Sequence, residues 1–185
     1  MEPKIVIFGA PSGVGKSAIT NALIEKYPQF YKRFPSVASR PMRHDESQGN
    51  PYIFVTNDEF EQKIKTGEVF EYTQIHGDYR GMSEDVIKDF ALDGKIIVND
   101  VDYIGVEALR RKYGKNVISF FLYISKEEVE KRLQSRGDDL GYIKFRISNY
   151  EMEMETSKHY DHMIENRDKD VCVENAHKII QEFFG

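Results

Sequence analysis

Short, continuously apolar runs recur along the chain and alternate with segments of helical periodicity. The runs KIVIF at 4–8, KIIVND at 95–100 and VISFFLYI at 117–124 have few polar interruptions. Such runs are typical of parallel strands that are buried on both faces. Because helix alternates with strand, the pattern predicts an α/β fold in which helices flank a mainly parallel sheet.

Helical periodicity fills the intervals between these runs. In segment 17–27 the apolar residues fall on one side of a helix. Ser125 has the features of a helix N-cap, and we predict a helix from there to about Arg136. Near the end of the chain, MIEN at 163–166 predicts a short strand and residues 173–185 predict a closing helix.

The character of the sequence changes between residues 35 and 83. Residues 35–50 are rich in Pro, Arg, Ser and Gly, which is typical of loops. The runs at 52–55, 69–75 and 78–82 then predict strands of a small antiparallel sheet. This part of the chain is therefore expected to be an insert in the α/β core.

We expect residues 1–185 to form a single domain, since this length suffices for one sizeable core. Residues 1–34 and 84–185 would form the core, and residues 35–83 the insert. A second interruption rich in glycine and acidic residues separates two Arg-bearing helices, as a mobile lid would. We place this lid at about 136–147.

Composition and charge narrow the function classes. The chain is 40% hydrophobic and 31% charged, which is typical of soluble globular proteins. Its net charge of −5 argues against a nucleic-acid partner, and no apolar run approaches the roughly 18 residues of a membrane span. We expect a cytoplasmic protein with no membrane partner, monomeric or homodimeric, in which the single Cys172 has a packing role.

The strongest chemical signal is GAPSGVGKS at 9–17. It follows the phosphate-loop pattern G-x-x-x-x-G-K-[ST], except that Ala10 replaces the first glycine. Glycines let backbone N–H groups turn toward a phosphate, the lysine neutralises the β and γ oxygens, and the serine hydroxyl can ligate magnesium. We predict that ATP with Mg²⁺ binds Ala10, Pro11, Ser12, Gly13, Val14, Gly15, Lys16 and Ser17.

A phosphate loop alone does not name a reaction. The chain lacks the N-K-x-D motif with which GTPases read guanine. A small kinase fits better, because the insert offers basic residues for a phosphorylated acceptor and the lid offers arginines that can cover the transfer. In contrast, we expect Arg110, Arg111 and Lys112 to lie on a solvated helix face.

The insert also resembles a known family. The segment SVASRPMRHDESQGNPYIFV at 36–55 is similar to the GMP-binding segment of guanylate kinases. The resemblance continues through VFEY, HGDYRGMS, VNDVDYIG, EKRLQSRG and IEN, so that it spans essentially the whole chain. It implies a P-loop nucleoside monophosphate kinase, which transfers the γ-phosphate of ATP to GMP or dGMP.

The resemblance also implies roles for individual residues. The residues implied in catalysis are Lys16, Arg40, Arg136 and Arg146. Those implied in GMP binding are Ser36, Arg40, Arg43, Glu46, Tyr52, Glu71, Arg80, Met82 and Asp102. Arg132 and Arg136 would join the loop in binding ATP, and Asp100 would join Ser17 at the metal. Guanidinium and phenol donors suit a phosphate dianion, and the Glu71 carboxylate suits the N1–H and N2–H of guanine.

Two positions depart from the family pattern. Arg80 and Met82 stand where the family usually has a tyrosine that touches the GMP phosphate and a serine or threonine that touches guanine O6. Arg80 can still bind phosphate. Met82 cannot donate a hydrogen bond to O6, and one lost contact of this kind corresponds to roughly tenfold in affinity or rate.

Two alternative functions remain open. A related kinase with another acceptor, such as ribose 1,5-bisphosphate, is favoured by Arg80 and Met82 but opposed by Glu71 and Ser36. A non-catalytic guanylate-kinase-like binding module is opposed by the intact Gly-Lys-Ser at 15–17, since such modules typically lose the phosphate loop.

Overall fold

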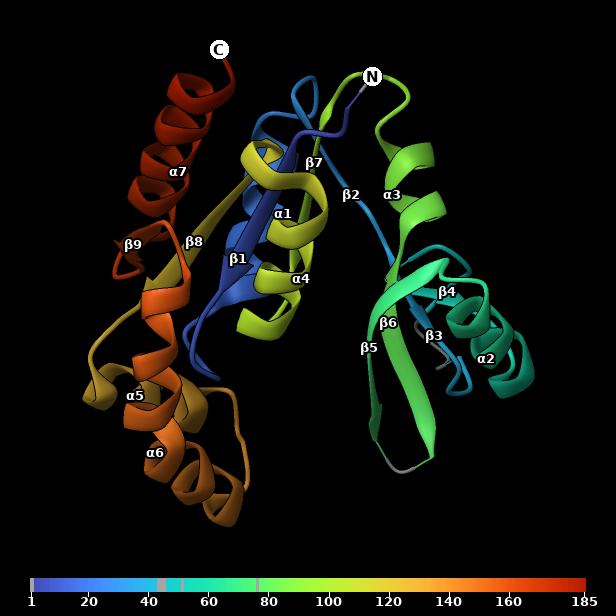
Figure 1. Cartoon of the computed structure of the whole chain (residues 1–185). Helices are drawn as coiled ribbons and strands as arrows, with labels where there is room; N and C mark the ends of the chain where they lie inside the picture. Colours follow the sequence, from blue (N-terminus) through green and yellow to red (C-terminus); the bar gives the residue numbers. More distant parts are fainter. Residues whose placement is uncertain (1, 43–45, 51, 76) are drawn as a thin grey trace.

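A five-stranded parallel sheet forms the centre of the molecule (Figure 1). The computed structural model describes residues 2–42, 46–50, 52–75 and 77–185. The strand order is β2-β7-β1-β8-β9, and every neighbouring pair is parallel. The strands are β1 (Ile5–Gly9), β2 (Tyr31–Arg33), β7 (Ile96–Asp100), β8 (Val117–Tyr123) and β9 (His162–Glu165).

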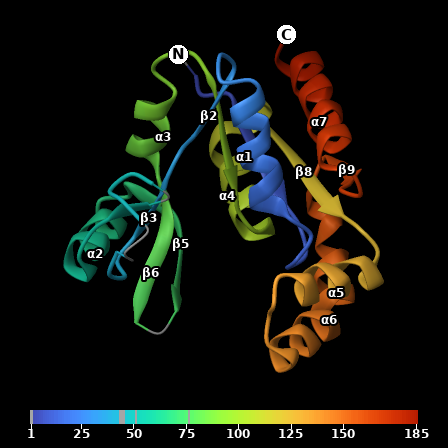
Figure 2. The ribbon, with the colours of Figure 1, turned by 180° about the vertical axis from the view of Figure 1, so that it is seen from behind.

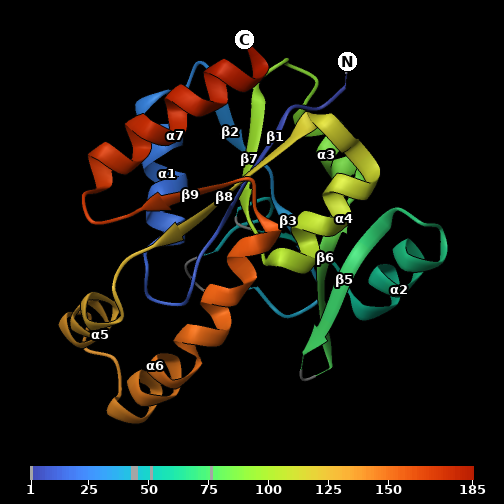
Figure 3. The same cartoon turned by 60° about the vertical axis from the view of Figure 1, so that its left-hand side comes forward.

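Helices cover both faces of this sheet, as Figure 3 shows. On one face, α1 (Lys16–Lys26) and α7 (Lys169–Phe184) pack against a core that includes Phe8 and Phe120. On the other face, the helices α3 (Glu84–Phe90) and α4 (Tyr103–Tyr113) pack against the alternate β1 residues, Ile5 and Ile7. The predicted α/β fold is confirmed. No helix in the part of the chain that the model describes is long and apolar enough to cross a membrane.

A second, four-stranded sheet has the order β4-β3-β6-β5. Its strands are β3 (Ser36–Ala38), β4 (Tyr52–Phe54), β5 (Val69–Ile75) and β6 (Asp78–Ser83), and the helix α2 (Asn57–Lys65) packs on it through Phe60. The prediction of a purely antiparallel sheet is wrong, because β3 and β4 pair in parallel. The sequence analysis also missed β2 and β3, whose residues YKR and SVA do not form an apolar run like the YIFV at 52–55 that predicted β4.

The helices α5 (Lys126–Ser135) and α6 (Leu140–Glu155) form a separate pair. Ser125 caps α5 as predicted, by accepting a hydrogen bond from the Glu128 N–H at 3.3 Å. α7 begins earlier than predicted, because the Asp168 carboxylate caps its first turn. Figures 1 and 2 show the α5–α6 pair and the second sheet on opposite flanks of the parallel sheet.

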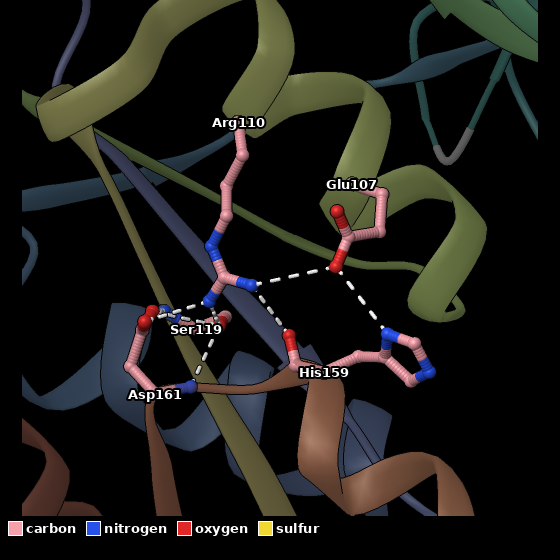
Figure 4. A network of polar contacts seen from close by, with 5 residues as sticks. All are labelled: Glu107, Arg110, Ser119, His159 and Asp161. Carbon is pink, nitrogen blue, oxygen red and sulfur yellow. Dashed lines mark hydrogen bonds and ion pairs between the residues drawn. The ribbon is translucent and has the colours of Figure 1, made fainter.

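Arg110 ties α4 to the segment that follows α6 (Figure 4). It donates hydrogen bonds to the His159 carbonyl at 2.6 Å and to Ser119 Oγ at 2.8 Å, and it pairs with Asp161 at 2.7 Å. Glu107 completes the network through His159 Nδ1 at 3.3 Å. The expectation that Arg110 lies on a solvated face is wrong, because its partners come from distant parts of the sequence and do not show in the local pattern.

Candidate active site

The phosphate loop joins β1 to α1 and is held in shape by the surrounding chain. Gly13 and Gly15 have φ angles of 91° and 101°, which side chains with a Cβ rarely adopt. The Val14 carbonyl accepts hydrogen bonds from Asn166 Nδ2 at 2.8 Å and from Arg132 Nη1 at 3.1 Å. The loop therefore presents the N-terminus of α1 in a fixed conformation suited to an anion.

Lys16 and Ser17 begin α1 beside the carboxyl end of β7. Burial lowers the pKa of the Lys16 ammonium, although Asp102 and Glu153 oppose this shift. Ser17 Oγ donates a hydrogen bond to Asp100 Oδ2 at 2.9 Å. A hydroxyl and a carboxylate fit Mg²⁺, which proteins usually hold through one or two carboxylates together with substrate phosphates and waters. Within the described ranges no group of three or more His, Cys, Asp or Glu side chains is placed to hold a metal.

A pocket of about 220 Å³ lies between the phosphate loop and the second sheet. Most of the predicted acceptor residues line it together with donor residues: Lys16, Ser36, Tyr52, Glu71, Arg80, Met82, Asp100 and Asp102. Strand register explains this. Ser36 pairs with Tyr52 in β4 and Glu71 pairs with Met82 in β6, so that these four residues form one row across the sheet.

The Glu71 carboxyl group has an unusual protonation equilibrium. Burial, reinforced by the nearby Asp102 carboxylate, raises the pKa of Glu71 to about 7. A carboxyl group whose pKa lies far from its ordinary value, in a pocket with other charged groups, is a good candidate for a functional residue. Glu71 is therefore a candidate ligand-binding residue of this pocket, whose ionised form could accept hydrogen bonds.

Cationic and aromatic side chains gather around Tyr52. Arg40 is buried, forms two hydrogen bonds with the Glu46 carboxylate at 2.5 and 2.7 Å, and lies 5.2 Å from the Tyr52 ring. Arg80 approaches the same ring to 5.6 Å. Glu46, predicted to bind the acceptor, here orients Arg40. Arg43 lies outside the described residues.

The three arginines predicted in or beside the lid have different surroundings. Arg132 lies against the phosphate loop. Arg136 forms an ion pair with Asp138, and Arg146 lies 4.8 Å from the ring of Tyr142. The geometry thus brings Arg132 to the loop, whereas Arg136 and Arg146 have partners within the α5–α6 segment.

A second pocket, of about 500 Å³, adjoins the phosphate loop on the side of α4 and α6. Its wall includes Glu153, whose Oε2 accepts a hydrogen bond from the Ser12 N–H at 2.7 Å. The sequence analysis did not identify Glu153, because an acidic residue in the half-buried helix α6 gives no local signal. This contact ties the end of α6 to the loop.

Comparison with known proteins identifies the family. The family model described as guanylate kinase matches residues 2–183. The chain belongs to the guanylate kinase family. A guanylate kinase from Bacteroides fragilis is 36% identical over 188 residues, covering 100% of this chain and 91% of the relative. One from Photorhabdus laumondii is 34% identical, covering 96% of this chain and 86% of the relative.

A solved structure agrees with this membership at the level of the fold. The guanylate kinase from Anaplasma phagocytophilum superposes with a TM-score of 0.73 at 23% identity, covering 100% of this chain and 88% of that one. The comparisons confirm the predicted enzyme class, a nucleoside monophosphate kinase.

The structure of this guanylate kinase family member also adds site residues that the sequence analysis missed. Asn99 is buried between the two halves of the site: its Oδ1 accepts a hydrogen bond from the Asp100 N–H at 2.8 Å, and its Nδ2 donates to Ser36 Oγ at 3.4 Å. Its position beside Asp100 in VND was a usable signal. Thr73 lines the acceptor pocket two residues after Glu71, and Arg33 forms an ion pair with Asp100.

Proposed function

We propose that the protein transfers the γ-phosphate of ATP to GMP or dGMP, giving ADP and GDP or dGDP. The observation that carries this proposal is the row across the second sheet in which Glu71 and Ser36 face the same pocket as Lys16 and Asp100. A carboxylate and a hydroxyl that can read guanine then lie beside the groups that hold the donor phosphates. Family membership supports the same reaction.

On the donor side, the backbone N–H groups of the loop would hold the β-phosphate of ATP. Lys16 would neutralise the β and γ oxygens, and Arg132 would add a positive charge beside the loop. When bound, Mg²⁺ supplies further neutralisation of the phosphate oxygens. Ser17 and Asp100, already 2.9 Å apart, are the residues that would hold it.

On the acceptor side, Arg40, Tyr52 and Arg80 would bind the phosphate of GMP, together with Arg43. Glu71 would accept hydrogen bonds from guanine N1–H and N2–H, and Ser36 would donate one to O6. Adenine has neither pattern. Above pH 7, where the Glu71 carboxylate is charged, adenine would leave it unpaired, and we expect adenine to be rejected by a factor of about 10⁴.

We further propose that residues 35–83 act as the GMP-binding insert and residues 136–147 as a lid. The partners of Arg136 and Arg146 support this view, since an ion pair made by a 60% exposed arginine and a ring contact can exchange for phosphate. Closure would bring both arginines to the transferring group, where charge neutralisation and positioning carry most of the catalysis.

A coupled assay of ADP formation tests the function directly. The purified protein is supplied with MgATP and, in turn, GMP, dGMP, AMP, UMP and ribose 1,5-bisphosphate. We expect GMP and dGMP to give a kcat/KM at least about 10³-fold above the others. Faster turnover of another acceptor would point to a different kinase, and no turnover of any acceptor would favour a binding module.

Replacing Met82 by serine is expected to lower the KM for GMP and, at the same time, to lower the stability of the fold. Met82 is 1% exposed and packs in the core beneath the pocket. A serine there would restore a hydrogen-bond donor beside guanine O6, so we expect the KM for GMP to fall about threefold to tenfold. The lost methionine side chain would lower the free energy of unfolding by about 2–4 kcal/mol.

Steady-state kinetics and thermal melting measure these two effects. Met163→Ser is the matched control, since Met163 is 50% exposed in β9 and its replacement is expected to change neither quantity. An unchanged or higher KM in Met82→Ser would show that another group already satisfies O6.

A further inference from the structure

Arg33 stands at the end of β2, next to the strand that carries Asp100. Its backbone pairs with Val98 in β7, and its guanidinium forms an ion pair with Asp100 Oδ1. The other arm of the guanidinium donates a hydrogen bond to Asn21 Oδ1 in α1 at 2.8 Å. The side chain is therefore fixed at both arms, between the sheet and the helix that begins with Lys16.

The electrostatic surroundings place this guanidinium between the two halves of the site. Its positive charge contributes to the lowered pKa of Lys16 on the donor side. Burial lowers the pKa of the Arg33 guanidinium, and Tyr52, on the acceptor side, partly opposes this shift. Asp100 lines the acceptor pocket and pairs with Arg33, so that Arg33 would act on the bound substrates through Asp100.

We propose that Arg33 is a positioning residue for phosphoryl transfer, which holds one carboxylate oxygen of Asp100 and thereby directs the other toward Ser17. This inference rests on the proposed kinase function, in which Ser17 and Asp100 hold Mg²⁺ with the ATP phosphates. The two oxygens of Asp100 have separate partners, since Oδ1 pairs with Arg33 and Oδ2 accepts from Ser17. Rotation of the carboxylate would break both contacts at once.

The expected size of the effect follows from metal chemistry. Mg²⁺ requires nearly ideal octahedral geometry, so a carboxylate that turns freely is a poorer partner than a fixed one. Loss of a group that orients a metal ligand typically costs about 10- to 100-fold in metal affinity or activity. Arg33 also offsets the negative charge of Asp100, which lies near Asp102 in the pocket wall.

The experiment compares Arg33→Met, Arg33→Lys and Lys32→Met with the parent protein. Lys32 is the matched control, because it is the neighbouring cation of β2 but pairs with Asp93 at 3.0 Å. Calorimetry gives the Kd of ATP without acceptor, once with Mg²⁺ and once with EDTA. Coupled kinetics give kcat and the KM for GMP, and thermal melting reports the fold.

We expect Arg33→Met to weaken ATP binding about tenfold in Mg²⁺ and less than about twofold in EDTA. Its kcat should fall about 10- to 100-fold while the KM for GMP stays within about twofold. Arg33→Lys, which keeps the charge, should recover part of both losses. Lys32→Met should behave like the parent protein.

Other results overturn the inference. Equal weakening of ATP binding with and without Mg²⁺, or no loss in either condition, would show that Arg33 does not act through the metal-binding pair. An Arg33→Lys variant that melts like the parent but recovers none of the Mg²⁺-dependent ATP affinity would also show that Arg33 does not act through this pair. ATP binding is measured without acceptor, so these outcomes do not depend on GMP turnover by the parent protein, which tests the proposed function.

Discussion

Replacing Lys16 by alanine is expected to lower kcat by about 10³-fold or more and to leave the fold intact. The ammonium group lies at the first turn of α1 and lines the acceptor pocket as well as the pocket beside Glu153. It is the one lysine of the phosphate loop, placed to neutralise charge on the transferring phosphoryl group. Losses of this size are typical when a preorganised positive charge is removed from such a site.

The same side chain contributes little to stability. Burial lowers the pKa of Lys16, which means that the folded protein disfavours its charged form at neutral pH. Its removal therefore relieves a cost in the empty protein, and we expect no fall in the melting temperature. This combination of a large catalytic loss and unchanged stability is characteristic of a residue that serves the ligand.

Coupled kinetics and thermal melting of Lys16→Ala test both parts. Lys26→Ala is the matched control, since Lys26 ends the same helix and pairs with Glu174 on the surface. It should keep the kcat of the parent protein. A Lys16→Ala variant that melts well below the parent, or keeps kcat within tenfold, would contradict the role in phosphate binding.

Replacing Glu71 by glutamine is expected to lower kcat/KM for GMP by about 10³-fold. A carboxylate can accept from guanine N1–H and N2–H together, whereas an amide presents an NH₂ group to one of them. The buried NH₂ would then face another donor, and an unsatisfied donor in a closed site is costly. The defect should appear mainly in the KM for GMP, with the Kd of ATP unchanged.

The raised pKa of Glu71 adds a pH dependence to this prediction. With a pKa of about 7 in the empty site, the carboxyl group is protonated below pH 7 and cannot accept both hydrogen bonds. We therefore expect the KM for GMP to rise up to tenfold per pH unit below 7 and to level off above it. The variant Glu71→Gln should lack this dependence.

Stability should change in the opposite sense. Because the folded-state pKa of Glu71 lies above its ordinary value of 4.5, the charged form destabilises the folded protein. This penalty is complete above pH 7 and disappears as the pH falls toward 4.5. Glu71→Gln should therefore melt above the parent at pH 8 and close to it near pH 4.5.

Melting at several pH values and kinetics between pH 6 and 8 measure these effects. Glu25→Gln, at an exposed position of α1, is the control and should alter neither. If Glu71→Gln keeps a parental KM for GMP, or melts below the parent at pH 8, Glu71 does not have the assigned role in reading guanine.

The main elements of the core could be predicted because their signals are local. β1 is continuously apolar, and β7 and β8 have few polar residues, since these strands are buried on both faces. The phosphate loop requires glycine where φ is positive and lysine at the start of the helix, and these residues form a recognisable sequence motif. By contrast, β2 and β3 take part in the sheets through register with strands distant in sequence.

In the site, too, some features could be predicted from the sequence and others depend on the tertiary structure. Family resemblance assigned Ser36, Glu71 and Met82 to one ligand, and the structure places them in one row across the second sheet. Their roles toward GMP stay predictions. The sequence analysis counted Met82 only as a missing donor, whereas the structure shows that it also fills the core beneath the pocket.

By itself, the sequence determined the α/β class and the phosphate loop, which follow from residue type and spacing over short stretches of chain. The resemblance to guanylate kinases, and not local spacing, predicted the phosphate and the base that the insert would bind. Only the tertiary structure decided that Arg33 faces Asp100, that Glu153 binds the Ser12 N–H, and that burial beside Asp102 raises the pKa of Glu71. Each of these depends on distance and desolvation between residues far apart in sequence, which exist only once the sheets and helices have packed.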